Sequence, residues 1–227
     1  INFDKNNRYL ENVKIYLHKF LLMMIITDLQ YFGTISFIQS LIELDKVSFD
    51  HTHPFSKMSF KNRTVIATAQ GPLHLSIPLI GGRDQKTPLK DIKISYDSPW
   101  NEQHYKSLVS NYQRAPYFEY YQDQIKAIYL TKSIYLVEFL MICHEWTRKQ
   151  IKGKWEIVKA EENTAELNTE NNRIFDPWLP KNYAQITHPI KYQQVFEDKT
   201  GFLPNLSILD LLFCCGGKHG NQLLIQA

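Results

Sequence analysis

The feature that most constrains this chain is a short apolar strand followed at once by a helix and a second strand. Ile25 to Asp28 is a β-rich run, and Gly33 to Leu44 carries its apolar residues at helical spacing. Lys46 to Phe49 has the character of another strand. A strand–helix–strand unit of this kind predicts an α/β fold.

A hairpin is predicted in the middle of the chain. Thr64 to Thr68 and Leu73 to Leu79 are β-rich runs separated by residues 70–72, which contain glycine and proline. Asp91 to Tyr96 alternates like a third strand, so we expect a mixed sheet. The polar loop from Gly81 to Lys86 is either a lid over a site or a plain connection.

The second half of the chain is predicted to be mainly helical. Ser98 can cap a helix that begins with Pro99, because a serine hydroxyl accepts hydrogen bonds from free N–H groups. Asn205 can cap a closing helix in the same way, and that helix should end at two glycines. The expected helices are 98–113, 118–129, 132–149 and 206–213, with the closing glycines at 216 and 217.

The length of 227 residues fits one domain with an appendage. We expect residues 1–22 to be an extension, 23–217 to form a single α/β domain, and 218–227 to be a tail. Residues 160–172 are acidic and polar and predict a solvated loop inside that domain. The apolar run at 20–26 is far shorter than the roughly 20 residues of a membrane span, so no membrane association is expected.

Charge and cysteine content exclude several classes of protein. The net charge of +3 is too small for a dedicated nucleic-acid surface. The three cysteines lack disulfide or zinc spacing, which favours a reducing cytoplasm. His51 and His53 lie beside Asp50, but no second ligand cluster supports a metal site. No cofactor motif is present, so neither a metal nor a cofactor is expected.

The first candidate constellation lies at the start of the predicted hairpin. Lys57, Lys61, Asn62 and Arg63 stand together there, and a guanidinium can bind phosphate or carboxylate through two hydrogen bonds. These residues predict an anion site in one interpretation. In the other they form a solvated edge strand whose lysines discourage aggregation.

The second candidate constellation is an aromatic stripe on the helix after Ser98. Trp100, His104 and Tyr112 recur every four residues, or multiples of four, and share one helix face. Arg114 and Tyr117 follow at its end. Histidine can act as a general base or acid near neutral pH, and tyrosine and arginine can stabilise developing negative charge. The alternative is a hydrogen-bonded histidine in the core.

Five blocks of sequence occur in an order and spacing that resemble the WbqC-like protein family of bacteria. The resemblance extends from about Met24 to Gly217, and the family's usual Q-P-x-Y-x-P-W-x-G segment is altered here to LQYFGTIS at 29–36. The five blocks are KMSFKNR at 57–63, GPLHLSIP at 71–78, WNEQH at 100–104, YQRAPYF at 112–118 and FLPNLSILDLLF at 202–213.

The resemblance implies a small α/β protein whose relatives are associated with O-antigen or other surface-polysaccharide biosynthesis. Transfer of glycine or a similar acyl group has been proposed for them. By analogy with Rossmann-like folds, the helix that follows the first strand has the layout of a nucleotide site. The positions that match the family blocks and could form a site are Asn62, Arg63, Trp100, His104, Tyr112, Arg114, Asn205 and Asp210.

Two functions follow as hypotheses. The first is a transferase that places an aminoacyl or acyl group on an amino-sugar of a nucleotide-linked precursor. Arg63 and Arg114 would bind phosphate or carboxylate, His104 would take a proton, and Trp100 or Tyr117 would stack on the substrate. The second is a non-catalytic binding or scaffold protein that recognises a nucleotide, a peptide or a partner enzyme.

Overall fold

The computed structural model describes residues 25–52, 54–56, 58–81, 86–158, 173–174 and 177–226, with 173–174 described in the backbone alone. The expected N-terminal extension, the loop at 160–172, Lys57 and His53 lie outside these residues, as do Gly82 to Gln85 of the predicted lid. None of the described helices has the length and apolar character needed to cross a membrane.

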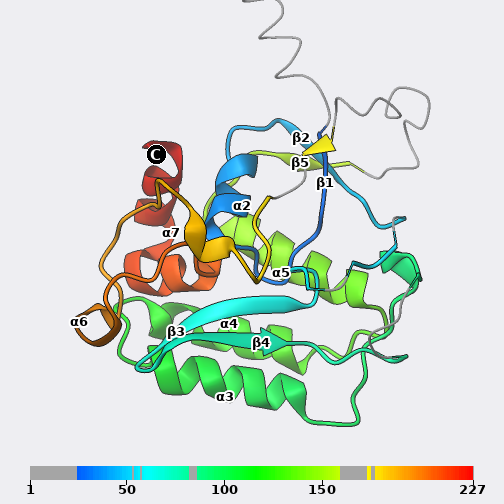
Figure 1. Cartoon of the computed structure of the whole chain (residues 1–227), viewed down its shortest axis with the longest axis horizontal. Coiled ribbons are helices and arrows are strands. Elements are labelled where there is room, and N and C mark those ends of the chain that lie inside the picture. The colour runs from blue at the N-terminus through cyan, green and yellow to red at the C-terminus, as the bar shows by residue number, and fades with distance from the viewer. Residues whose placement is uncertain are drawn as a thin grey trace, which may run out of the picture.

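A small parallel sheet forms one side of the molecule (Figure 1). Its strands are β1 (Ile25–Thr27), β2 (Lys46–Phe49), β5 (Glu156–Ile157) and β6 (Arg173–Ile174), in the order β5-β2-β1-β6. Helix α2 (Ile35–Leu41) joins β1 to β2 and buries its apolar face. The strand–helix–strand prediction and the α/β class are therefore confirmed, whereas the sequence did not reveal β5 and β6.

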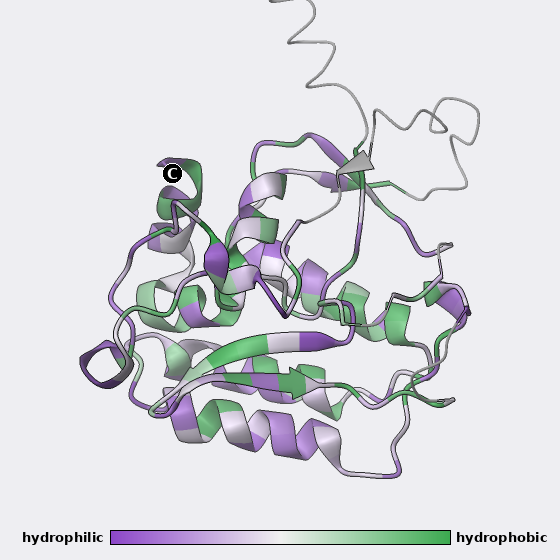
Figure 2. Cartoon of the chain, viewed as in Figure 1, coloured by the Kyte–Doolittle hydropathy of each residue, from purple (hydrophilic) through white to green (hydrophobic). Residues whose placement is uncertain are grey.

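The predicted hairpin consists of β3 (Arg63–Thr68) and β4 (Gly71–Ser76), paired antiparallel with Arg63 opposite Ser76. It forms a sheet of its own, so the parallel and antiparallel pairings lie in two sheets and not in one mixed sheet. Figure 2 shows hydrophobic residues along much of β3, most of which is buried. β3 is therefore the interior strand of the hairpin, whereas β4 is its outer strand, with four of its six residues exposed.

The expected strand at 91–96 is wrong. The 3₁₀ helix η1 (Leu89–Asp91) replaces its start, and the rest makes only isolated bridges, Leu79 to Ile94 and Lys93 to Tyr135. Burial still alternates through this stretch, which explains the period-two pattern. The same bridges hold residues before α5 extended, so that helix begins at Leu136 and not at Lys132.

Three helices follow the hairpin in the chain, and in the view of Figure 1 α3 lies beneath β4, while α5 lies above β3. The end of α3 is fixed to β3, because the Ala67 amide donates to the hydroxyl of Tyr112 at 2.9 Å. Ser98 does not cap α3 with its side chain; Pro99 occupies the N-cap position, and the Trp100 amide donates to the Ser98 carbonyl. The three helices are α3 (Trp100–Tyr112), α4 (Phe118–Leu130) and α5 (Leu136–Gln150).

The C-terminal segment contains η4 (Tyr183–Gln185), α6 (Glu197–Thr200) and α7 (Ile208–Gln226). The first helical stretch of α7 ends at Gly216 as predicted, and a second helical stretch, which was not predicted, follows it to Gln226. Gly216 has φ 72° and ψ 166°, a conformation that glycine alone adopts readily, so it separates the two stretches. Residues 218–226, the described part of the expected tail, are therefore helical.

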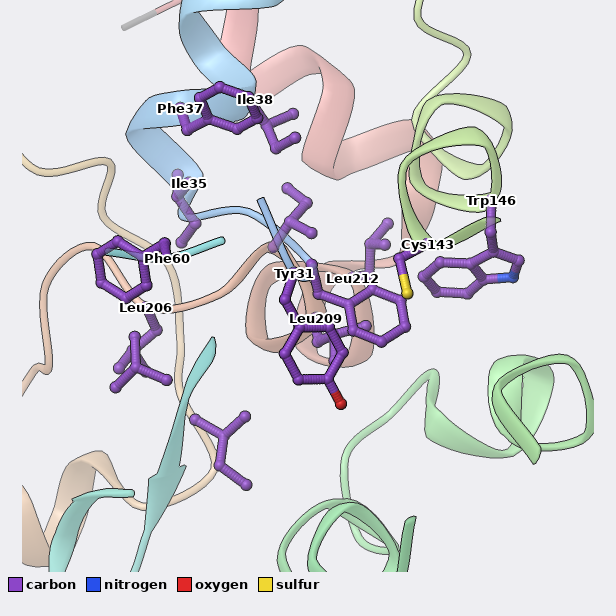
Figure 3. Close-up of a cluster of buried hydrophobic side chains, with 14 of the residues drawn as sticks. Tyr31, Ile35, Phe37, Ile38, Phe60, Cys143, Trp146, Leu206, Leu209 and Leu212 are labelled. Carbon is purple, nitrogen blue, oxygen red and sulfur yellow. The ribbon is translucent and has the colours of Figure 1, made fainter. Parts of the chain in front are cut away.

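The start of α7 closes the core against segments far away in sequence. The Ile208 amide donates to the Gly33 carbonyl, and the Ser207 amide donates to the Val65 carbonyl. Figure 3 shows Leu209 and Leu212 of this helix beside Tyr31, whose hydroxyl points out of the aliphatic cluster. Both the parallel sheet and the hairpin thus share one core with α7.

Candidate functional site

His104 is a buried residue of α3 and not a groove residue. Its side chain is 6 % exposed, and its Nδ1 lies 3.0 Å from the hydroxyl of Tyr31, which also contacts the hydroxyl of Tyr129. The main chain of Ser76 stabilises the charged ring to some extent. Burial outweighs that effect and lowers the pKa of His104 to about 4.

This environment limits what His104 can do. A histidine with a pKa near 4 is neutral at pH 7 and is a weak base. Its neighbour Trp100 is 2 % exposed, so its indole ring is closed to any sugar or base. The aromatic stripe is therefore part of the core, as the alternative interpretation holds, and the catalytic role of His104 stays a prediction.

Tyr112 and Asp210 are brought together, but deep in the core. The Tyr112 hydroxyl donates to one carboxylate oxygen of Asp210 at 2.6 Å, and the Tyr192 hydroxyl donates to the other at 2.6 Å. Gln194 adds a third hydrogen bond at 3.3 Å. Burial raises the pKa of Asp210, while the three hydrogen bonds act in the opposite direction. This network ties α3 to α7 and to the loop before α6.

Asn62 and Arg63 lie at the open end of the hairpin. The Asn62 amide donates to the Ile77 carbonyl at 2.9 Å, and Arg63 Nε donates to the hydroxyl of Ser76 at 3.0 Å. Lys61 points the other way, with its Nζ 2.9 Å from a carboxylate oxygen of Asp28 at the end of β1. The predicted basic cluster is therefore divided. Asn62 and Lys61 are held by structural partners. Arg63 is half-buried and uses its Nε for Ser76, which leaves its terminal guanidinium nitrogens for an anion.

Asn205 does not cap the closing helix; it caps α2. Its Oδ1 accepts from the Ser36 amide at 2.9 Å, and Thr34 Oγ1 accepts from the Phe37 amide. The Ile35 amide donates to the Leu206 carbonyl. Because these three amides at the start of α2 already have protein acceptors, they are not available to a phosphate, and the Rossmann analogy gains no support from them.

Arg114 and Tyr117 lie at the junction of α3 and α4, where both side chains are exposed. Tyr117 borders a hollow of about 560 Å³ between the start of α4, the end of α5 and the break in α7. Tyr120 and Tyr121 add two more aromatic rings, and Lys152 adds a cation. Tyr117 is thus the one predicted site residue that the structure places in this hollow, which we call the Tyr117 pocket.

The Tyr117 pocket is shaped by two glycines in the break of α7. A Cβ atom on Gly216 would stand 2.8 Å from the ring of Tyr117, and one on Gly217 would stand 2.1 Å from the carbonyl oxygen of Gln150. The hydroxyl oxygen of Tyr121 would also stand 3.4 Å from a Cβ atom on Gly217. Close approach of the three helices therefore depends on glycine at both positions.

Most of this pocket does not follow from the sequence. The two glycines predict the end of a helix, which leaves Lys218 and His219 in a tail. Lys152 stood in a stretch with no recognisable motif. The available signal was the glycine pair itself, inside an apolar run that resumes at 223–225. The residues that line the pocket are Tyr117, Tyr120, Tyr121, Gln150, Lys152, Cys215, Gly216, Gly217, Lys218, His219 and Gln222.

Metal-binding candidates gain no support within the described residues, which contain no cluster of three His, Cys, Asp or Glu side chains suited to a metal ion. His51 Nδ1 lies 3.0 Å from the Phe49 carbonyl, and Asp50 accepts hydrogen bonds from Thr52. These contacts give both residues a role in shaping the turn after β2.

The comparison with protein families supports the resemblance seen in the motifs. The WbqC-like protein family matches residues 29–177, well over half of the chain. The match begins just after β1, includes every element from α2 to β6, and ends before the block at 202–213. No curated protein and no solved structure matches the chain significantly. On the strength of the family match, the chain belongs to the WbqC-like protein family.

Proposed function

We propose that this protein is a transferase that places an aminoacyl or acyl group on an amino-sugar of a nucleotide-linked precursor in surface-polysaccharide biosynthesis. The free cysteines fit a reaction in a reducing cytoplasm. The observation that carries the proposal is the Tyr117 pocket, which combines aromatic walls with cationic side chains. The polysaccharide pathway is what the resemblance to the WbqC-like family implies.

The pocket suits a sugar or base attached to phosphate. Tyrosine rings offer flat faces for stacking and hydroxyls for hydrogen bonds, and Tyr117 and Tyr120 are 45 % and 69 % exposed. In the reaction, the amine nitrogen attacks the carbonyl carbon of an acyl ester or thioester. The new amide bond forms as the alkoxide or thiolate leaves, and the proton lost from nitrogen passes to a base.

The second candidate function is recognition without catalysis, and a specific observation favours it. His104 is buried and bound to Tyr31, and Asp210 is enclosed by three hydrogen-bonding partners. Neither side chain is free to take a proton from a substrate in the Tyr117 pocket. A protein that only binds a nucleotide-sugar and presents it to a partner enzyme would need the pocket alone.

A transfer assay separates the two functions. The purified chain is incubated with UDP-linked amino-sugars and acyl donors, and products are detected by the mass added on amide formation. Stacking on an aromatic ring is worth about 1–3 kcal/mol, so Tyr117→Ala should lower the rate by about 5- to 150-fold. Leu130→Ala, at the exposed far end of α4, is the control and should leave it unchanged.

The outcomes point in different directions. Transfer by the wild type that falls in Tyr117→Ala supports the transferase. Binding of the sugar without turnover, lost in Tyr117→Ala, favours recognition. Transfer that is indifferent to Tyr117→Ala would remove the pocket from the reaction.

A further inference from the structure

The Tyr117 pocket carries positive charge that no acidic residue balances. Lys152, at the end of α5, and Lys218, in the resumed part of α7, reach it from two different helices, and His219 stands beside Lys218. The residues that line the pocket are all described, and none of them is Asp or Glu. An anion at this place therefore meets two ammonium groups and no competing carboxylate.

The backbone of Lys152 is unusual for a lysine. Its φ of 53° lies in the left-handed region, at the position after a helix where glycine is strongly preferred. A side chain there costs roughly 1 kcal/mol compared with glycine. Gly153, the next residue, has no such φ; glycine is needed there because a Cβ atom would stand 2.3 Å from the ring of Trp155. Strained backbone is found at ligand-binding sites among other places, so Lys152 is consistent with a binding role.

The walls that carry the two lysines are fixed to each other. Asn221, one turn beyond Lys218, donates to the Ile151 carbonyl at 2.7 Å. The contacts of Gly217 with Gln150 and Tyr121 hold the start of the resumed helix against α5 and α4. The two ammonium groups therefore extend from rigid elements, and a ligand need not assemble the site.

We propose that the Tyr117 pocket binds a diphosphate group between Lys152 and Lys218, with the sugar or base of the ligand against Tyr117 and Tyr120. Two lysines carried by neighbouring segments of α5 and α7 suit a group with two adjacent phosphates better than a single carboxylate, because each ammonium can pair with its own phosphate. This inference shares its pocket with the proposed function and rests on it to that extent. It does not require the transfer reaction, because a diphosphate can bind without any transfer.

The test measures binding by calorimetry, with inorganic pyrophosphate, UDP and uridine as the probes. Removing one charge-assisted hydrogen bond lowers affinity about tenfold or more. We therefore expect UDP to bind more tightly than uridine, and both Lys152→Gly and Lys218→Gln to weaken UDP and pyrophosphate at least tenfold. Lys154→Gln is the matched control: it removes the same charge two residues away, outside the pocket lining, and should change nothing.

Lys152→Gly also separates a binding role from a structural one. Glycine relieves the left-handed backbone, so the melting temperature should stay equal or rise while affinity falls. A Lys152→Gly variant that loses both melting temperature and affinity would indicate a structural role for this lysine. The affinity of Lys218→Gln, a change at an exposed position, would then show whether the pocket binds phosphate through its lysines. Equal affinity for UDP and uridine, no binding of either phosphate probe, or binding indifferent to both lysines would each overturn the proposal. Phosphate binding without transfer would leave it standing and count against the transferase alone.

Discussion

At the scale of single residues, the buried histidines are the strongest unusual feature of this molecule. His104 and His144 are 6 % and 3 % exposed, and burial lowers their pKa values to about 4 and about 3. His144 accepts a hydrogen bond from the indole of Trp155 at 3.1 Å, as a neutral ring can. Both imidazole rings are thus uncharged at neutral pH and belong to the core.

The low pKa of His104 predicts that acid destabilises the fold. Between pH 6.5 and 4 the unfolded chain takes up a proton at this residue and the folded chain does not, so stability falls as pH falls. The full effect of this one group is about 3 kcal/mol, reached near pH 4 and absent above pH 7. The measurement is the free energy of unfolding in urea at steps of half a pH unit.

The same experiment on His104→Gln isolates this contribution. Glutamine can still exchange hydrogen bonds with Tyr31 but cannot titrate, so the slope should fall by about 1.4 kcal/mol per pH unit between pH 6 and 4.5. His188→Gln, at an exposed position, is the control and should keep the wild-type slope. An unchanged slope in His104→Gln would mean that its ring is charged in the folded state.

At the scale of elements, α2 depends on a residue far away in sequence. It has seven residues, too few to be stable alone, and its Ser36 amide is capped by Asn205. Asn205 also donates to the Tyr183 carbonyl at 3.1 Å and has a left-handed φ of 53°. One side chain therefore joins α2, η4 and the approach to α7.

Replacing Asn205 separates its cap from its backbone conformation. Asn205→Gly removes both hydrogen bonds but accepts the left-handed φ, and should cost about 1–3 kcal/mol of stability. Asn205→Ala removes the same bonds and adds strain of about 1 kcal/mol. The difference between the two midpoints of urea unfolding reports the strain alone. Equal midpoints for wild type and Asn205→Gly would show that neither hydrogen bond contributes.

Local sequence rules succeeded for elements whose partners are near in sequence. The hairpin and α3 to α5 follow from turn residues and helical spacing, and their observed ends differ from the predicted ones by a few residues. The strand expected at 91–96 failed because its pairing partners, Leu79 and Tyr135, supply one bridge each. The alternation of apolar and polar residues reports which side chains are buried. It does not report how many backbone hydrogen bonds the segment makes with neighbouring strands.

The site was harder to predict than the fold for the same reason. Trp100, His104 and Tyr112 were correctly placed on one helix face, but the sequence could not show that a core covers that face. The Tyr117 pocket combines residues from α4, α5 and α7 that lie up to about a hundred positions apart. Only the break at Gly216 brings them together, and a glycine predicts a break or an end equally well.

At the scale of the whole molecule, the family match stops at residue 177, but the folded core does not. Six apolar side chains between 206 and 213 are fully buried, and each contributes about 1.5–3 kcal/mol. That sum is comparable to the whole stability of a domain, roughly 5–15 kcal/mol. The six are Leu206, Ile208, Leu209, Leu211, Leu212 and Phe213.

A chain that ends at Leu203 should therefore fail to fold, even though it contains the entire family match. It loses the backbone bonds that Ile208 and Ser207 make with residues near β1 and in β3. A chain that ends at Gly217 keeps those bonds and loses only the resumed helix, with Leu224 as its one large buried side chain. It should unfold cooperatively at a lower temperature and bind no pyrophosphate, because Lys218 is gone. Thermal melts followed by circular dichroism test both chains. A cooperative melt of the shorter one would show that α7 docks onto a core already complete without it.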